Sequence, residues 1–143
     1  MTVSAILAGK GRDVVTIGGS ASITEVVGLL AARKIGAVVV VEEDGRIAGI
    51  VSERDVVRAM AAEAAAALSR TVSSIMTRAV VTCSEGETID GVMSRMTRGR
   101  FRHLPVVTNG RLSGIISIGD VVKARIEQVE REAEDMRAYI ATA

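Results

Sequence analysis

Apolar residues along the chain recur with two different periods. In two stretches they stand three or four positions apart, which predicts amphipathic helices at Ile23–Ile35 and Ile89–Phe101. Two further helices are expected near Glu53–Leu68 and Gly119–Ile140. Short runs rich in β-branched residues predict six strands: Val14–Ile17, Ala37–Val41, Arg46–Val51, Val80–Cys83, His103–Val107 and Arg111–Ile116. The order strand, helix, strand, strand, helix therefore occurs twice.

Turn and cap residues fit this order. Asp44-Gly45 and Asn109-Gly110 are strong hairpin signals between the second and third strand of each set. Ser22 and Glu25 have the spacing of a capping box at the start of the first helix.

The two sets are copies of one unit. Residues 44–59 align without gaps on residues 109–124, and 9 of these 16 positions are identical. Val14-Val15-Thr16 likewise matches Val80-Val81-Thr82. The sequence therefore predicts an α/β (α+β) fold of two pseudosymmetric βαββα repeats packed through their sheets. The expected boundaries are 1–68 for the first repeat, 69–125 for the second and 126–143 for a C-terminal helical extension.

Composition narrows the function. Trp is absent and only Phe101 and Tyr139 are aromatic, so a stacking platform for single-stranded bases is nearly excluded. A net charge of +1 gives no long-range attraction to nucleic acid or membranes. Cys83 is the only cysteine, which suits a reducing compartment. No signal peptide or membrane span is recognisable, so we expect a soluble, cytoplasmic protein.

One motif occurs in both copies where a strand runs into a helix. Gly49–Asp55 and Gly114–Asp120 both read Gly-apolar-apolar-Ser-x-x-Asp. This spacing is that of a capping box, and caps are common. The same geometry also suits a nucleotide, because a helix N-terminus attracts phosphate and a carboxylate can accept hydrogen bonds from a ribose diol. Both interpretations stay open on the spacing alone.

The motifs together resemble the tandem cystathionine-β-synthase (CBS) domain family up to about Arg125. The second copy carries the closest match, with Ile75-Met76-Thr77, then Arg102–Val107, then Gly110–Asp120. The resemblance implies a regulatory ligand such as AMP, ADP, ATP, NAD or S-adenosylmethionine in the groove between the repeats. It also implies ribose contacts from the two aspartates, phosphate or ribose contacts from the two serines, and adenine contacts from the apolar residues that precede them.

The two copies differ beside this motif. The first begins with a Gly-rich basic loop, Leu7–Asp13, which is three residues longer than its counterpart and is equally readable as a phosphate loop or a solvated turn. The second has a basic cluster, Arg95 to His103, without an acidic residue between Asp90 and Asp120. The predicted ligand-binding residues are Lys10, Val14, Thr16, Gly36, Ala37, Ile50, Ser52, Arg54, Asp55, Val80, Thr82, Arg102, His103, Ile115, Ser117, Gly119 and Asp120.

Catalysis and metal binding are not expected. His103 is the only histidine, so one chain cannot assemble a two-histidine or Cys/His metal site, and no nucleophile elbow is present. We therefore expect a binding module without a catalytic residue, catalytic cofactor or metal, acting on an unknown protein partner. The main alternative is a ligand-free structural module for dimerisation or protein interaction, and a nucleic-acid binder is disfavoured.

The C-terminal helix carries a second pattern. Its apolar residues recur at spacings of four and three, as in a heptad seam: Val122, Ile126, Val129, Ala133, Met136 and Ile140. Packing on the same repeat would account for Val122 and Ile126, but less well for Met136 and Ile140. We therefore expect a homodimer joined through the helix beyond Arg125.

Overall fold

The computed structural model describes residues 1–142, and Ala143 lies outside them. The chain divides into two compact units. The three-stranded unit comprises Asp13–Val81 and Asn109–Ser113, and the two-stranded unit comprises Met1–Arg12, Thr82–Thr108 and the chain from Gly114 onward. Each unit therefore combines segments that are far apart in the sequence.

The three-stranded unit holds the body of the first repeat. Strand β1 (Thr16–Gly18) lies parallel to β2 (Ala37–Val41), which is antiparallel to β3 (Ile47–Ser52). Helices α2 (Ile23–Arg33) and α3 (Glu53–Glu63) pack on this sheet. A 3-10 turn (Ala64–Ser69) and the short α4 (Val72–Ile75) follow. Its buried core contains Ile23, Val26, Leu30, Val38, Val40, Val51 and Val72.

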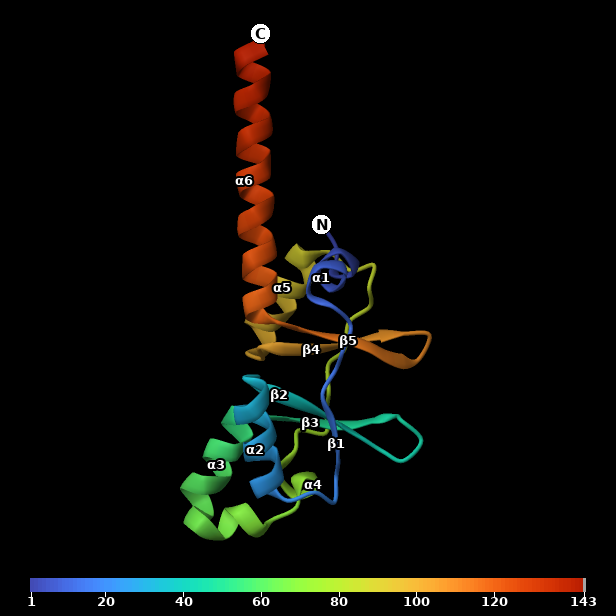
Figure 1. Cartoon of the computed structure of the whole chain (residues 1–143), viewed down its shortest axis with the longest axis vertical. Coiled ribbons are helices and arrows are strands. Elements are labelled where there is room, and N and C mark those ends of the chain that lie inside the picture. Colours follow the sequence, from blue (N-terminus) through green and yellow to red (C-terminus); the bar gives the residue numbers. More distant parts are fainter. Residues whose placement is uncertain (143) are drawn as a thin grey trace. The chain divides into compact units, whose positions relative to one another are not determined.

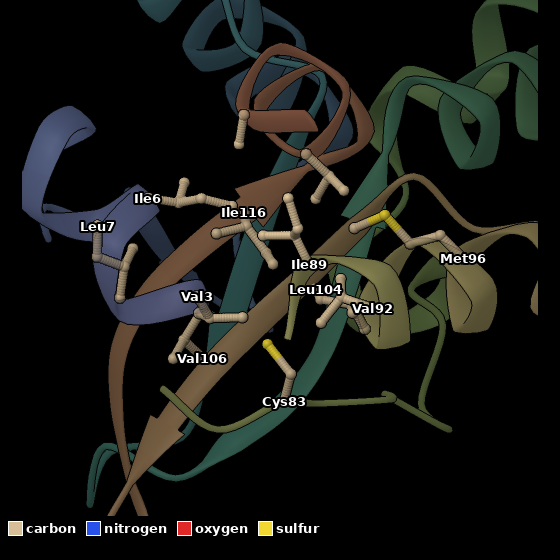
Figure 2. Close-up of a cluster of buried hydrophobic side chains, with 12 residues drawn as sticks. Val3, Ile6, Leu7, Cys83, Ile89, Val92, Met96, Leu104, Val106 and Ile116 are labelled. Carbon is tan, nitrogen blue, oxygen red and sulfur yellow. The ribbon is translucent and has the colours of Figure 1, made fainter. Parts of the chain in front are cut away.

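The two-stranded unit holds the body of the second repeat. Strands β4 (His103–Thr108) and β5 (Arg111–Ser117) form its sheet, with α5 (Ile89–Gly99) and α6 (Ile118–Thr142) beside it. Helix α1 (Val3–Lys10) joins them from the other end of the chain (Figure 1). The buried cluster in Figure 2 contains Val3, Ile6, Leu7, Cys83, Ile89, Val92, Met96, Leu104, Val106, Ile116, Val121 and Ala124.

The segments that precede the two repeats are exchanged between the units. Val3 N–H donates to Glu87 O at 2.9 Å in the two-stranded unit, and Val72 N–H donates to Ala21 O at 2.8 Å in the three-stranded unit. These segments match each other, Thr2–Leu7 with Thr71–Met76, and each ends in a large apolar side chain. Each short helix thus completes the core of the other repeat, which accounts for the composition of the units.

Two glycines make room for these side chains. A Cβ at Gly114 would lie 2.7 Å from Leu7 Cδ2, and a Cβ at Gly49 would lie 2.7 Å from Met76 Sδ. Gly49 and Gly114 occupy the same position in β3 and β5, just before each helix cap. A Cβ at Gly49 would also lie 2.8 Å from the backbone oxygen of Thr77. The two glycines of the repeated motif therefore leave room for the exchanged segments.

The α/β fold class and both hairpins are confirmed, with three corrections to the predicted elements. Val80–Cys83 is not a strand, because only Cys83 forms an isolated bridge, to Val106. The predicted helix Glu53–Leu68 ends at Glu63, where Ala64 has a positive φ of 52°, and a 3-10 turn follows. Helices α1 and α4 were not predicted, although α4 has only four residues.

Helix α6 turns a different face to its own unit than we expected. Val121 and Ala124 are buried, whereas Val122 and Ile126 are exposed. None of the described residues of α6 beyond Ala124 is buried, and Figure 1 shows this part (red) continuing past α5 and α1. Although α6 is long, no helix in residues 1–142 is apolar enough over such a length to cross a lipid bilayer.

Candidate functional site

The first copy of the motif forms a complete capping box at the start of α3. Ser52 N–H donates to Asp55 Oδ2 at 2.9 Å, and Asp55 N–H donates to Ser52 Oγ at 3.3 Å. The next amide, Glu53 N–H, donates to Gly36 O at 3.0 Å. The capping interpretation is therefore confirmed here, and the cap fixes the Asp55 carboxylate at the end of the sheet.

Thr77 completes this site from the exchanged segment before the second repeat. Its backbone pairs with Ile50 through N–H to O at 2.8 Å and O to N–H at 3.0 Å. Its hydroxyl donates to Asp55 Oδ1 at 3.3 Å. Both oxygens of Asp55 therefore accept hydrogen bonds from backbone and hydroxyl groups.

The second copy forms the same cap at the start of α6. Ser117 N–H donates to Asp120 Oδ2 at 2.8 Å, and Asp120 N–H donates to Ser117 Oγ at 3.2 Å. Ile118 N–H donates to Arg102 O at 2.7 Å, in the position that Gly36 O has in the first copy. The two caps are therefore equivalent in their backbone geometry.

Lys10 takes the place of Thr77 in this second site. Its ammonium Nζ donates to Asp120 Oδ2 at 2.6 Å and to Ile115 O at 3.0 Å. Thr77 contacts the equivalent carboxylate with its hydroxyl and the equivalent carbonyl, Ile50 O, with its backbone N–H. One cation therefore makes the two contacts that two neutral donors make in the first copy.

The ion pair determines the ionisation of Asp120. Partial burial raises the pKa of this carboxyl, but the hydrogen bonds from Lys10 and Ser117 and the charge of Lys10 lower it below its ordinary value of 3.8. The Lys10 side chain is 34% exposed and that of Asp120 is 24% exposed. Asp120 is therefore an anion at neutral pH that water and small molecules can still reach.

The structure brings together only part of the predicted set. Lys10, Ile115, Ser117 and Asp120 meet in the two-stranded unit, with the Arg102 carbonyl beside them. In the three-stranded unit Ile50, Ser52 and Asp55 meet, with Gly36 and Ala37 alongside, since Ala37 pairs with Ser52 across β2 and β3.

The remaining predicted residues take no part in the contacts described above. Thr16 is in β1, Val14 precedes it, and Val80 and Thr82 lie outside any strand. Arg54, His103 and Gly119 lie in α3, β4 and α6, and their ligand roles stay predictions. Thr77 was missed, although it lies in the Ile75-Met76-Thr77 motif that carries the family resemblance.

Part of the positive charge of the basic cluster, Arg95 to His103, is balanced by an acidic residue from outside the cluster. Arg95 donates to Glu87 Oε1 and, at 2.6 Å, to Thr82 O. Glu87 precedes α5 and lies outside the span from Asp90 to Asp120 that the prediction considered. Arg95 therefore has an acidic partner within its own unit and does not need a ligand phosphate to balance its charge. Arg12 likewise pairs with Glu85. A phosphate role for Arg102 and His103 stays a prediction.

Cys83 is a core residue, as expected. It is buried in the cluster of Figure 2. Burial, reinforced by the charge of Glu87 and opposed by that of Arg95, raises the pKa of its thiol to about 11. The thiol is therefore protonated at neutral pH and packs as a small apolar group.

The chain thus has two equivalent carboxylate-capped helix starts on a duplicated α/β unit. The family model for the CBS domain matches residues 8–62 and 72–127. The chain therefore belongs to the CBS-domain family and carries two copies of the domain. The boundaries at residues 68 and 125 stay a prediction.

Solved structures of similar proteins agree with this assignment. A crystal structure of a CBS-domain containing protein from Agrobacterium tumefaciens has 57% sequence identity and a TM-score of 0.85, covering 87% of this chain and 92% of that one. The CBS domain pair of protein MJ0100, in complex with 5′-methylthioadenosine and S-adenosyl-L-methionine, has 28% identity and a TM-score of 0.80, covering 90% and 98% of the two chains.

A curated relative is longer than this chain. The mitochondrial CBS domain-containing protein CBSX3 of Arabidopsis thaliana is 35% identical over 112 residues, which cover 76% of this chain and 54% of that protein. The chain spans 20% to 54% of the length of four such relatives. The similarity therefore concerns the CBS pair and not the additional parts of those proteins.

Proposed function

We propose that the chain is a regulatory module that binds adenine nucleotides (AMP, ADP, ATP or NAD) at the starts of α3 and α6. The observation that carries this proposal is the duplicated carboxylate, Asp55 and Asp120, fixed by the same cap in both copies. The complex of the similar MJ0100 pair with two adenosine compounds supports an adenosine ligand. No catalytic step is required of such a module.

The ribose is the part of the ligand that the carboxylates suit. In each site one Asp oxygen accepts the rigid Ser backbone N–H. The other donors, the Thr77 hydroxyl and the Lys10 ammonium, belong to side chains that can rotate away. The two hydroxyls of a ribose can replace those donors at the carboxylate. A charged acceptor makes each such hydrogen bond worth about 1.5–3 kcal/mol.

The charge of Lys10 selects among adenosine ligands at the α6 site. A ribose on Asp120 releases the ammonium from its ion pair, and the released cation needs a new anion. A phosphate on the same ligand supplies it. At the α3 site, Asp55 accepts hydrogen bonds from Ser52 and from the neutral hydroxyl of Thr77, which stands in the place of Lys10. Binding at this site is therefore expected to depend less on a phosphate of the ligand.

Calorimetry with isosteric variants tests the nucleotide sites. Asp55→Asn and Asp120→Asn keep an acceptor for the cap but remove the charge, so each is expected to lower affinity at one site by tenfold or more, about 1.4 kcal/mol. The double variant loses both. The thermal unfolding of each variant without ligand serves as the control for folding. Unchanged binding of AMP, ATP and NAD in the double variant would exclude the ribose role.

The alternative of a ligand-free structural module makes a different prediction. A nucleotide that binds the folded state stabilises it by about 2.7 kcal/mol at a hundredfold excess over Kd. If no adenine compound raises the unfolding temperature of the native chain, the Ser and Asp residues only cap the helices, and the ligand-free structural module is the correct description.

A regulatory module must pass the signal of ligand binding to another protein through a surface other than the ligand site. We propose that it signals to a protein partner as a homodimer, and that the exposed apolar residues of α6 beyond Arg125 join the two copies. The single buried cysteine fits the reducing cytoplasm that we propose as its compartment.

A further inference from the structure

Helix α6 carries an exposed apolar seam. Ile126, Met136 and Ile140 are 53%, 61% and 67% exposed, and Val122 and Val129 are exposed as well. Ala124 is the last of the described α6 residues that is buried in its own unit. Most helical stability in proteins comes from packing of an apolar face, so the exposed seam is the part of α6 that requires another surface.

The seam has the spacing of a coiled coil. Counting heptads along α6 puts Ile126, Ala133 and Ile140 at position a, and Val122, Val129 and Met136 at position d. Ile at a with Leu at d favours two strands, but position d holds Val and Met here, so the seam by itself does not fix the number of strands. Two strands follow from the homodimer of the proposed function. A second copy of α6 therefore fits the seam, because it offers the same residues at the same spacing.

The charges beside the seam fit a parallel pair. In a parallel coiled coil, position g of one helix faces position e in the next heptad of the other. This places Arg125 opposite Glu130 of the other copy, and Glu132 opposite Arg137 of the other copy. By symmetry each of these attractive pairs forms twice.

The same charges oppose an antiparallel pair. When the seams overlap fully in opposite directions, e faces e and g faces g. Lys123 then faces Arg137, Glu130 faces Glu130, and Glu132 faces Glu132. All three juxtapositions are repulsive. The direction of the helices is therefore specified by charge, while the apolar seam by itself is compatible with both.

We propose that α6 binds α6 of a second copy as a parallel, in-register, two-stranded coiled coil. This deepens the homodimer of the proposed function and rests on it. The module then presents its two copies on the same side of a shared helical stem, so that both α6 starts, with Lys10 and Asp120, lie at the same end of that stem.

Charge swaps at one g–e pair test the direction. Glu132→Arg alone places two arginines opposite each other in a parallel dimer, and Arg137→Glu alone places two glutamates opposite each other. Each variant is expected to raise the dimer Kd by about tenfold. A mixture of the two variants restores wild-type affinity as a heterodimer, because every pair is again attractive. Glu134→Arg and Arg131→Glu make the same charge changes off the seam and serve as controls.

Light scattering and disulfide trapping read the outcome. Val129→Cys at position d is expected to cross-link two full-length chains through the same residue, with buried Cys83 left unreacted. A monomer under all conditions overturns the homodimer itself. A dimer that ignores the charge swaps and is not trapped by Val129→Cys leaves the homodimer standing and overturns the parallel stem. A dimer tightened by Arg137→Glu alone shows an antiparallel pair and likewise overturns the proposal.

Discussion

The two helix caps have the same backbone geometry but different donors opposite the carboxylate. At the start of α3, Asp55 accepts hydrogen bonds from the neutral Ser52 and Thr77. At the start of α6, Asp120 accepts the same cap and an ammonium, and the site is neutral as a pair. Duplication preserved the backbone of the site, whereas the donor opposite the carboxylate diverged.

The difference comes from the segments that follow Leu7 and Met76, which differ in length. Leu7 and Met76 occupy equivalent positions beside Gly114 and Gly49. From Leu7 to Val14 the chain has three more residues than from Met76 to Val80. In this longer segment α1 continues to Lys10, whose side chain reaches both Asp120 and Ile115. A difference in length outside the repeated motif thus decides which donor contacts its carboxylate.

The largest difference between the copies is expected at the exchanged side chains. Leu7 is 1% exposed, whereas Met76 is only partly buried. Leu7→Ala is expected to lower the free energy of unfolding by about 2–5 kcal/mol, as for other fully buried leucines. Met76→Ala is expected to cost clearly less. Urea unfolding of both variants measures the difference, and equal losses would contradict the burial argument.

A smaller difference is expected in ligand choice. Lys10→Met removes the ammonium and keeps a long side chain, so affinity for AMP at the α6 site is expected to fall about tenfold. Adenosine, which has no phosphate, is expected to bind as well as before or better, because no ion pair must be broken. Calorimetry on the Asp55→Asn background isolates this site.

Thr77→Val is the matched control in the other copy, since it removes the hydroxyl and keeps the backbone pair with Ile50. It is expected to leave the AMP-to-adenosine ratio unchanged. Equal losses of AMP and adenosine in Lys10→Met would show that Lys10 only supports the fold.

The smallest effect is the stability of the ion pair itself. Because the pKa of Asp120 is lower in the folded than in the unfolded chain, the pair stabilises the fold above about pH 3.8 and loses its effect as the pH falls through the folded value. A double-mutant cycle of Lys10→Met and Asp120→Asn should give a coupling of about 1 kcal/mol or less at pH 7, since both groups are partly exposed. The same coupling at pH 7 and pH 3 would contradict the assignment.

The repeated pattern predicted most of the fold. The amphipathic spacing gave α2 and α5 to within two residues at their C-terminal ends, and the hairpin signals placed β2 to β5. The prediction of a strand at Val80–Cys83 was wrong, because β-branched residues also occur in extended segments that do not pair with a neighbouring strand. Cys83 alone pairs, through N–H to Pro105 O at 3.0 Å.

The exchanged segments could have been found from the sequence. Thr2-Val3-Ser4 repeats as Thr71-Val72-Ser73 at an offset of 69, which differs from the offsets of 65 and 66 elsewhere. The insertion after Leu7 causes that difference and hides the match. The Lys10–Asp120 pair could not have been predicted, because it joins residues 110 positions apart and depends on helix α1, which was itself not predicted.

The exchange of segments also has a consequence for synthesis on the ribosome. Helix α1 leaves the ribosome well before its partners in β5 and α6, which are made about a hundred residues later. At roughly 5–20 residues per second, Val3, Ile6 and Leu7 wait on the order of 5–20 seconds without the core that buries them. Meanwhile the chain up to Val81 already contains every buried residue of the three-stranded core, including Val72 of α4. The residues of the three-stranded core are therefore complete in the growing chain before α1 has its partners, and the apolar side chains of α1 stay without their core until α6 has been made.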